Sequence, residues 1–444
     1  MKTVIMAGGK GTRISSLICD VPKPMIPISG KPVLEHQIEC LHRQGFNDIV
    51  LTVSHLGTQI IEYFGDGGGI SPATGKPFGV NIEYYLEKEP LGNAGALIKI
   101  KDKLSNDFLL LNGDLIFDID LERFVQYHKT RHALVTLFTH PNSHPYDSGL
   151  IVANPDGTVQ KWISKRDPRP LYYHNRVNAG VHLINSKVFD FLALDPENIG
   201  QKGKDGKTIQ VDLDRQLLQP LAGTGYMYCY DSPEYVKDMG TPERYELVGK
   251  DLEAGRVAAK NLNQKQKAVF LDRDGTINKY VGFLQKIEDF ELIPGVSNAI
   301  RKINESGYLV IVVTNQPVIA RGELSLEELD EIHHKMETLL GQDGAYIDAV
   351  YYCPHHPDRG YEAERKEFKI DCECRKPKPG MLIKAAQDFH IDLKHSWMVG
   401  DGKNDIQAGK SAGCKTVHIG DPREVYGQDI TVSCLKDFAD HYIK

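Results

Sequence analysis

Two polar motifs, each placed directly after a short apolar run, constrain the fold of this 444-residue chain most strongly. AGGKGTR at residues 7–13 overlaps the end of the apolar stretch TVIMA near the N-terminus. FLDRDGTIN at residues 270–278 places Asp272 and Asp274 with one residue between them, before the turn-forming Gly275. Glycines or acids at the carboxyl end of a strand are typical of the ligand-binding edge of an α/β sheet. The sequence therefore predicts two sheets, each with a ligand-binding edge.

Apolar runs alternate with helix-like stretches on both sides of the polar segment NLNQKQK. This alternation predicts mainly parallel, Rossmann-like α/β sheets flanked by helices. Helices are predicted over 33–45, ending at Gly45, and over 243–259. Strands are predicted at 3–7, 48–53, 108–112, 133–138, 308–313 and 396–399, with a new strand starting at Ala268. We predict two domains, residues 1–260 and 268–444, joined by the linker 261–267.

Composition narrows the class of protein. The chain is 41% hydrophobic with a net charge of -7, which predicts a soluble globular protein without nucleic acid as its partner. No apolar run approaches the ~18 residues of a membrane span, and the N-terminus is interpreted as a first strand and not a signal peptide. The eight cysteines do not suggest a disulfide framework, so the reducing cytoplasm is the simplest location. The oligomeric state stays open, a homo-oligomer included.

The first motif, AGGKGTR, matches neither the P-loop nor the dinucleotide fingerprint. It offers the amides of Gly8, Gly9 and Gly11 to an anion, together with Arg13. Lys23, set among prolines, adds a second cation. Taken alone, a glycine-rich turn after a strand is more commonly only a turn.

A series of spaced motifs makes residues 1–245 similar to the sugar-phosphate nucleotidyltransferases. The motifs are the glycine loop with its Arg, Pro-Lys-Pro, EPLGNAGAL (89–97), LNGD (111–114), VNAGVHLI (177–184) and KDMGTPERY (237–245). In this family a sugar 1-phosphate attacks the α-phosphorus of a nucleoside triphosphate and pyrophosphate leaves. Both reactants are anionic, so catalysis depends on positioning and on cations.

The resemblance implies roles for individual residues. Asp114 and Asp238 would hold Mg²⁺, although alone the first could cap a helix and the second could be a surface acid. Ser164 stands where the family has Glu, which leaves the sugar-hydroxyl contacts open. Arg13 and Lys23 would neutralise the triphosphate; Gly8, Gly9, Gly11, Gly92 and Asn93 would contact the nucleotide; Lys165 and Asn178 would bind the sugar phosphate.

The second motif suits a phosphatase. One carboxylate of the pair can attack phosphorus and form an aspartyl-phosphate, while the other protonates the leaving oxygen and then activates water. A calcium turn or a helix cap is the alternative for two acids at this spacing. Three further segments supply phosphate-binding and acidic residues: VVTNQ (312–316), RKPKPG (375–380) and MVGDGKND (398–405).

In this order the motifs resemble the haloacid dehalogenase superfamily over about residues 266–440. The resemblance implies that Asp272 is the nucleophile and Asp274 the general acid and base. Mg²⁺ would be held by Asp272, the Asp274 carbonyl and Asp401, with Asp405 in support. The transferring phosphoryl group would be bound by Thr314, Asn315 and Lys376.

A cysteine cluster predicts a second metal. YYCPHHP (351–357) and CEC (372–374) offer soft ligands suited to tetrahedral Zn²⁺. The predicted ligands are Cys353, His355, Cys372 and Cys374, with His356 as the substitute for His355. The site has no open position, so we interpret it as structural, fastening the loop that carries Arg375 and Lys376. Free core thiols are the alternative.

The zinc loop, with DRDGT, TNQ, ARG and CRKPKPG, resembles the heptose 1,7-bisphosphate 7-phosphatases, with histidinol-phosphate phosphatases as near relatives. Pro317-Val318 departs from the family's Ser-Gly, removes an amide donor beside the phosphate site and puts turnover in question. The first half looks most like mannose- and heptose-1-phosphate guanylyltransferases. The hypothesis is a bifunctional enzyme that makes GDP-heptose for lipopolysaccharide or capsule. Other sugars, nucleotides or phosphate monoesters, and one domain serving only for binding, are the alternatives.

Overall fold

The computed structural model describes the chain in two compact units. The described residues are 1–8, 21–54, 56–89, 91–104, 106–192, 195–203 and 206–443. Unit 1 contains Met1–Thr139, Ile151–Ile163 and Asn178–Asn261, and unit 2 contains His140–Leu150, Ser164–Val177 and Leu262–Lys444. The chain passes from unit 1 to unit 2 for the last time between Asn261 and Leu262, which is inside the predicted linker 261–267. Two segments predicted to belong to the first domain, His140–Leu150 and Ser164–Val177, lie instead in unit 2.

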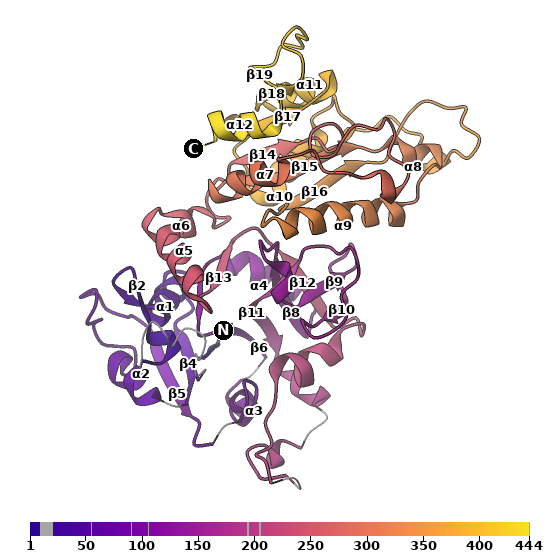
Figure 1. The fold of residues 1–444 in the computed structure, drawn as a ribbon. Helices are drawn as coiled ribbons and strands as arrows, with labels where there is room; N and C mark the ends of the chain where they lie inside the picture. Colours follow the sequence, from indigo (N-terminus) through magenta and orange to yellow (C-terminus); the bar gives the residue numbers. More distant parts are fainter. Residues whose placement is uncertain are drawn as a thin grey trace. The chain divides into compact units, whose positions relative to one another are not determined.

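Unit 1 is built on a mixed, mainly parallel sheet (Figure 1). Its path is β10-β9-β11-β6-β1-β4-β5, with β8 added beside β11 and β12 beside β8. The neighbours of the central strand β1 run parallel to it, and β11 runs antiparallel to β6. The strands are β1 (Thr3–Met6), β4 (Asp48–Val53), β5 (Asn81–Leu86), β6 (Asp107–Asn112), β8 (Val135–His140), β9 (Leu150–Ala153), β10 (Val159–Ile163), β11 (Val177–Asn185) and β12 (Met227–Asp231).

Alternate residues of the unit 1 strands pack into two cores, one on each face of the sheet. Ile5 and Leu111 face one core, and their neighbours Val4 and Leu110 face the other. The first core is covered by α1 (Val33–Arg43), α2 (Gly57–Phe64) and α4 (Leu121–Thr130), and the second by α3 (Gly95–Lys99) and the π-helical turn Leu213–Leu218. A side ribbon joins β7 (Leu115–Asp118) to β13 (Tyr235–Asp238), and β2 (Pro27–Ile28) pairs with β3 (Lys31–Pro32).

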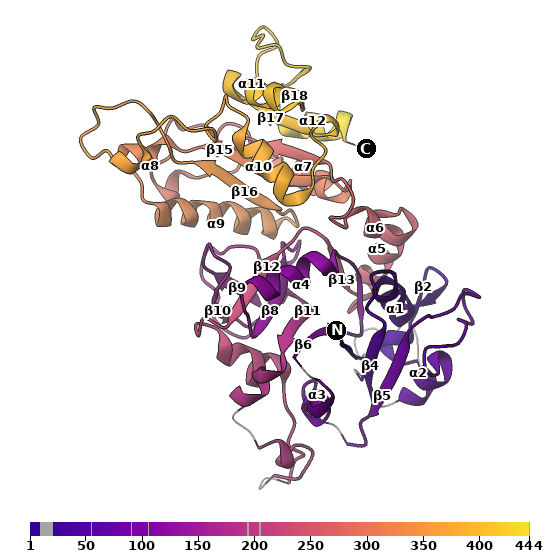
Figure 2. The same cartoon turned by 180° about the vertical axis from the view of Figure 1, so that it is seen from behind.

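Unit 2 is built on a six-stranded sheet in which every adjacent pair is parallel (Figure 2). The order is β16-β15-β14-β17-β18-β19, so the first strand of this unit lies in the middle of the sheet. The strands are β14 (Ala268–Leu271), β15 (Leu309–Asn315), β16 (Ala349–Cys353), β17 (Trp397–Gly400), β18 (Lys415–Ile419) and β19 (Ile430–Val432).

The two faces of the unit 2 sheet are covered by different helices. Val269 and Leu271 pack with α7 (Val296–Glu305), α8 (Pro317–Arg321), α9 (Leu326–Gln342) and α12 (Leu435–Tyr442). Ala268 and Phe270 pack with α10 (Gly380–Phe389) and α11 (Lys403–Ala412). The predicted fold class, two α/β domains with largely parallel sheets, is confirmed.

One local prediction needs correction. The helix expected over 243–259 is broken into α5 (Pro242–Glu253) and α6 (Arg256–Ala259), because Gly255 adopts the left-handed conformation at φ 70°. The predicted linker 261–267 contains both exposed and buried residues. Gln266 is buried, and its N–H donates to the carbonyl of His390 at 3.0 Å.

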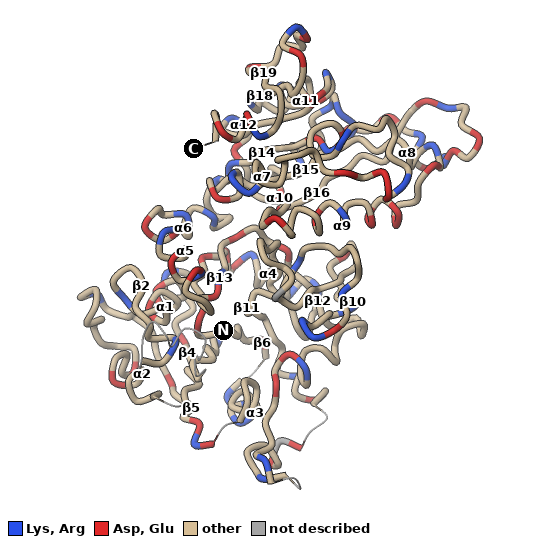
Figure 3. Tube along the Cα trace, viewed as in Figure 1, with Lys and Arg blue, Asp and Glu red and all other residues tan. Residues whose placement is uncertain are grey.

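Acidic and basic residues are interspersed along both units (Figure 3). Among the described residues, no helix has the length and apolar character needed to cross a membrane.

Candidate functional site

The motif residues of unit 2 meet at one edge of its parallel sheet. Asp272 directly follows β14, and its N–H donates to the carbonyl of Val399 in β17 at 3.0 Å. Carboxylate oxygens of Asp272, Asp401 and Asp405 lie within 4.8 Å of one another. Gly275 makes this approach possible, since a Cβ there would lie 2.0 Å from Asp401 Oδ2. The sheet therefore brings Asp272 together with two acids that lie more than a hundred residues further along the chain.

Lys376 is the buried cation of this cluster. Its Nζ lies 2.8 Å from Asp272 Oδ1 and 2.6 Å from Asp405 Oδ1, and it donates to the carbonyl of Val313 at 2.7 Å. Burial acts to lower the pKa of Lys376, but the two carboxylates outweigh it and raise the pKa. Lys376 therefore remains charged beside the residue predicted to attack phosphorus.

One lysine does not neutralise three carboxylates. Burial and the nearby Asp405 raise the pKa of Asp272 to about 7 and that of Asp401 to about 6. Such shifts indicate a site with too little positive charge for its acids. Carboxylate oxygens at this spacing fit Mg²⁺, a hard cation that prefers oxygen ligands.

Three donors among the described residues hold the carboxylate of Asp274. Arg273 Nη2 lies 3.2 Å and 3.0 Å from its two oxygens, Asn278 Nδ2 lies 3.0 Å from Oδ1, and Gln316 Nε2 lies 2.9 Å from Oδ2. Burial acts to raise the pKa of Asp274, but the charge of Arg273 and the hydrogen bonds from Asn278, Gln316 and Arg273 together lower it. The carboxylate is thus fixed in one orientation.

The remaining predicted phosphate-binding residues are positioned around Lys376. Thr314 is buried, and its hydroxyl oxygen accepts from Gln316 Nε2 at 2.8 Å. The Asn315 amide is engaged with the main chain of Lys376, to which it makes bonds of 2.9 Å and 3.0 Å. Arg375 Nη1 donates to the carbonyl of His355 at 3.2 Å, which ties it to the cysteine cluster.

Pro317 and Val318 fit the start of α8. Pro317 occupies the first helical position, where a missing N–H leaves no intrahelical bond unmade. Val318 is buried in the core of this face of the sheet. The departure from Ser-Gly is therefore accommodated by the fold, and its effect on turnover stays a prediction.

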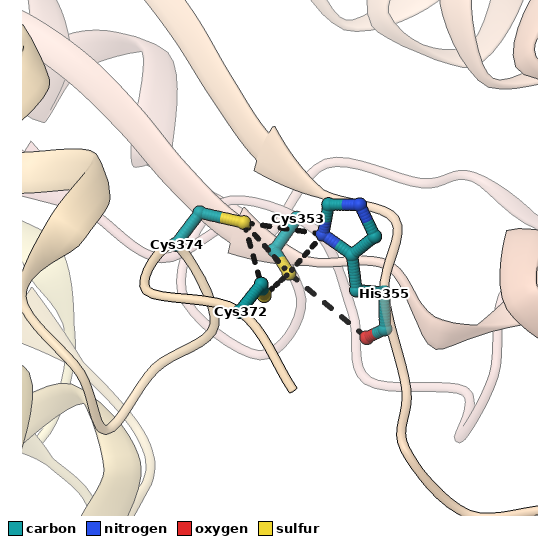
Figure 4. A group of neighbouring side chains, drawn as sticks. All are labelled: Cys353, His355, Cys372 and Cys374. Carbon is teal, nitrogen blue, oxygen red and sulfur yellow. Dashed lines mark hydrogen bonds between the residues drawn. The ribbon is translucent and has the colours of Figure 1, made fainter. Parts of the chain in front are cut away.

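The four predicted zinc ligands form one compact cluster in unit 2 (Figure 4). Cys374 Sγ lies 3.2 Å from each of the other two sulfurs and 3.3 Å from His355 Nδ1. A tetrahedral site with Zn–S bonds of ~2.3 Å separates its sulfurs by about 3.8 Å, so the donor set fits Zn²⁺ with small adjustments. His356 stands apart from the cluster, and its Nδ1 accepts from the N–H of Asp358 at 3.2 Å.

The pKa values of the three thiols differ in direction. The hydrogen bond with Cys374 raises the pKa of Cys353, and burial raises that of Cys372. A hydrogen bond with Cys353 is the main cause that lowers the pKa of the Cys374 thiol to about 5. Metal-binding cysteines act as thiolates.

In unit 1, three predicted residues meet where β6 and β13 end. Asp114 directly follows the LNG segment and forms an ion pair with Lys23. Asp238 pairs with Leu115 across the β13–β7 ribbon, which places it beside Asp114. Burial acts to raise the pKa of Asp238, but Arg244, at 2.8 Å, and Lys23 lower it. Two carboxylates are thus gathered among cations.

The predicted nucleotide-binding residues are described only in part. Gly9, Gly11 and Arg13 lie outside the described residues. At Gly8, a Cβ would lie 3.1 Å from Ser54 Oγ and 3.2 Å from Glu87 Oε1, so glycine permits a close approach.

Gly92 and Asn93 support the fold beside this region. Gly92 has φ 80°, and a Cβ there would lie 2.4 Å from the carbonyl oxygen of Val211. Asn93 Oδ1 accepts from the N–H of Leu213 at 2.7 Å.

The two predicted sugar-phosphate residues fall in different units. Asn178 lies near the start of β11, three residues before Val181, which pairs with Leu111 in β6. Asn178 Oδ1 accepts from His182 Nε2 at 2.9 Å. Lys165 is exposed and lies in the segment Ser164–Val177 of unit 2.

Sequence reasoning assigned no role to several residues that shape these sites. Arg273, Asn278 and Gln316 hold Asp274, and Glu87 lies beside Gly8. Arg273 and Asn278 stand inside the quoted motif FLDRDGTIN, so their position was a usable signal. Nothing in the local pattern distinguishes Glu87 from its acidic neighbours.

Comparison with known proteins identifies both parts of the chain. The model of a family described as nucleotidyl transferase matches residues 2–254, and that of the haloacid dehalogenase-like hydrolases matches residues 222–413. A D-glycero-beta-D-manno-heptose-1,7-bisphosphate 7-phosphatase of Salmonella typhi is 42% identical over 176 residues, which are 39% of this chain and 92% of that protein. The Haemophilus ducreyi protein of the same description is 44% identical over 152 residues, 34% of this chain and 81% of that one.

Two solved structures are similar to one part each. HddC from Yersinia pseudotuberculosis has 23% identity and a TM-score of 0.46, covering 56% of this chain and 99% of its own. A D,D-heptose 1.7-bisphosphate phosphatase from B. bronchiseptica, solved with magnesium and phosphate, has 33% identity and a TM-score of 0.35, covering 39% and 97%.

Proposed function

Because the chain belongs to the nucleotidyl transferase family and, in its second part, to the haloacid dehalogenase-like hydrolases, we propose that it carries out two successive steps on one sugar. Unit 2 removes the 7-phosphate of heptose 1,7-bisphosphate. Unit 1 joins the resulting heptose 1-phosphate to GTP, giving GDP-heptose and pyrophosphate. The observation that carries the first step is the cluster of Asp272, Asp401 and Asp405 around Lys376, with Asp274 fixed alongside.

The hydrolytic step uses the two aspartates of FLDRDGTIN. A carboxylate oxygen of Asp272 attacks phosphorus, the bond to the sugar oxygen breaks, and Asp274 gives that oxygen the proton that it took from water in the preceding turnover. Asp274 then takes a proton from water, whose oxygen attacks the aspartyl-phosphate and releases phosphate. Lys376 offsets the charge that builds up on the phosphoryl oxygens. Mg²⁺ held by Asp272, the Asp274 carbonyl and Asp401 supplies further positive charge there, with Asp405 in support.

The metal in the cysteine cluster has a structural role in this account. Cys353, His355, Cys372 and Cys374 supply all four ligands of a tetrahedral Zn²⁺ and leave no position for a substrate. Arg375 follows the last ligand and is bound to the carbonyl of His355. Closure of this loop therefore places Arg375 and Lys376 in the hydrolytic site.

The transfer step relies on charge and position. Asp114 and Asp238 hold Mg²⁺, Lys23 and Arg13 offset the triphosphate charge, and Asn178 lies at the same strand ends for the sugar. Gly8, Gly9, Gly11, Gly92 and Asn93 are the residues that we propose to contact the nucleotide.

Glu87 supports the assignment of the base. It is half-buried beside Gly8, and burial raises its pKa. A carboxylate presents two acceptors, which match the N1–H and N2–H₂ donors of guanine. Adenine, cytosine and uracil lack that pair of adjacent donors. Glu87 therefore favours GTP over the other triphosphates.

The order of the two steps follows from their chemistry. A phosphatase that spares the anomeric phosphate produces a sugar 1-phosphate, which is the nucleophile that a nucleotidyltransferase requires. This shared compound explains why the two activities are joined in one chain.

A stepwise assay tests the proposal. Heptose 1,7-bisphosphate is supplied with Mg²⁺, then GTP, ATP, CTP or UTP is added in turn, and phosphate and pyrophosphate are followed separately. We expect phosphate in the first stage and pyrophosphate only with GTP. If no phosphate were released from the bisphosphate, the assignment of unit 2 as its phosphatase would be wrong. If pyrophosphate were released faster with another triphosphate, the assignment of guanine as the base would be wrong. Histidinol phosphate and mannose 1-phosphate serve as the competing substrates.

A further inference from the structure

Arg273, the residue between the two aspartates, is a fully buried guanidinium. One edge of its fork, Nη2, faces both oxygens of Asp274 at 3.2 Å and 3.0 Å. The other terminal nitrogen, Nη1, lies 3.2 Å from Nε2 of His333, a buried residue of α9. A buried cation is stabilised when its charge is paired and its donors are bonded. Arg273 Nε has no hydrogen-bond partner among the described residues, so the two terminal nitrogens make the hydrogen bonds of the guanidinium. Asp274 supplies the charge and His333 supplies the acceptor.

The hydrogen bond from Arg273 Nη1 to His333 Nε2 requires a neutral imidazole. Arginine has donors and no acceptors, so His333 Nε2 must offer its lone pair to Arg273. Burial, and then the charge of Arg273, lower the pKa of His333 to about 3, which keeps the ring neutral at physiological pH. Because the guanidinium is planar and rigid, a bond that fixes one edge also fixes the other.

We infer that His333 is a positioning residue for the hydrolytic reaction, acting through Arg273 to hold the carboxylate of Asp274 in its working orientation. This inference rests on the proposed roles of Asp272 and Asp274 but not on the identity of the sugar. Without the acceptor, Arg273 Nη1 is buried and unbonded, and the guanidinium turns away from Asp274 to find another partner. Asp274 then keeps only Asn278 and Gln316 as donors.

Substitutions in the full-length protein separate positioning from a purely structural role. His333→Leu removes the acceptor, whereas His333→Gln keeps a carbonyl oxygen at similar reach. Met336→Leu changes a buried residue one turn further along the same helix and is the matched control. The hydrolysis of heptose 1,7-bisphosphate and of p-nitrophenyl phosphate is measured for each protein, so a wrong sugar assignment affects only the first substrate.

We expect His333→Leu to lower kcat about tenfold or more with KM little changed, as for an interaction that matters in the transition state. His333→Gln should retain kcat within about threefold, and Met336→Leu should match the unaltered protein. Equal kcat values for the Leu and Gln variants would overturn the inference. Should His333→Leu not fold, His333→Asn replaces it, because its shorter amide does not reach Arg273.

A crystal structure of the variant gives a test independent of turnover. In His333→Leu, or in His333→Asn if that replaces it, Arg273 should no longer contact both oxygens of Asp274. If the guanidinium kept both contacts, the positioning role of His333 would be excluded. The rate of GDP-sugar synthesis in the same sample verifies that the rest of the protein is intact.

Discussion

At the residue scale, the hydrolytic site is governed by one buried lysine among acids. Lys376 bridges Asp272 and Asp405, and both carboxylates raise its pKa. Replacing Lys376 by Met leaves three carboxylates together and raises the pKa of the proposed nucleophile Asp272, which must be ionised to attack. We expect phosphate release at pH 7 to fall about a hundredfold or more. Lys378→Met is the control, because Lys378 is partly exposed and pairs with Asp371 and Glu373. Comparable losses in both variants would contradict the role of Lys376.

Glu87 gives a second prediction at this scale. Glu87→Gln keeps the size of the side chain and replaces one acceptor by a donor, so it opposes one of the two guanine donors. A bidentate base contact is worth about 1–3 kcal/mol, so the preference of kcat/KM for GTP over ATP should fall ~10–100-fold. Glu83→Gln lies on β5 of the same unit, where Glu83 pairs with Lys2 and Lys103, and should leave the preference unchanged. An unaltered preference in Glu87→Gln would remove the argument for guanine.

At the scale of the element, the zinc loop connects metal binding to hydrolysis alone. Cys374→Ser weakens the cluster, so the purified protein should hold clearly less than the one equivalent of zinc expected of the unaltered chain. Phosphate release should fall because Arg375 and Lys376 lose their anchor, whereas transfer to supplied heptose 1-phosphate should persist. Cys434→Ser, outside the cluster, is the control. Full hydrolytic activity in a zinc-free protein would show that the loop does not need the metal.

Helix α9 is held by a segment from the first half of the chain. Glu337 is buried and accepts from the N–H of Asn175 at 2.6 Å and from His174 Nδ1 at 2.9 Å. Burial would raise the pKa of Glu337, but His174 and then Arg176 lower it to about 2 from an ordinary value of 4.5. A depressed carboxyl pKa contributes stability that is present above the unfolded value and is lost as the pH falls towards the folded value.

Glu337→Gln should therefore destabilise unit 2 by about 2–3 kcal/mol at pH 7, the scale of a charged hydrogen-bonded group. The gap between the variant and the unaltered protein should narrow between pH 4.5 and pH 2. Chemical denaturation of both proteins at pH 7, 5 and 3.5 measures this difference in the free energy of unfolding. A gap that stayed constant over this range would mean that the charge of Glu337 has no part in the stability.

The elements that sequence predicts well are those with a local signal. The strand before FLDRDGTIN and the helix α1, which ends at Arg43 close to the predicted end, each follow from a pattern within a few residues. The clustering of Cys353, His355, Cys372 and Cys374 follows from two such short patterns. The bond between Arg273 and His333 joins residues 60 apart, and that between Asn175 and Glu337 joins residues 162 apart. Such contacts depend on how helices pack on a sheet, which no local pattern contains.

At the scale of the whole molecule, the chain combines a nucleotidyltransferase part and a phosphatase part, and the proposed function gives them one shared intermediate. Segments expected in the first domain, His140–Leu150 and Ser164–Val177, complete the second unit. The sequence placed the boundary by the polar composition of 261–267, and composition does not reveal that a preceding segment packs with a later helix. The two chemistries nevertheless use separate sets of acids.

The most direct test of this account is a reciprocal pair of variants, Asp272→Asn and Asp114→Asn, assayed for both reactions. Asp272→Asn should release no phosphate from heptose 1,7-bisphosphate yet form GDP-heptose from supplied heptose 1-phosphate and GTP. Asp114→Asn should do the reverse, and a mixture of the two proteins should convert the bisphosphate to GDP-heptose. If Asp272→Asn remained folded but lost both reactions, the claim of two separate sites in one chain would be wrong.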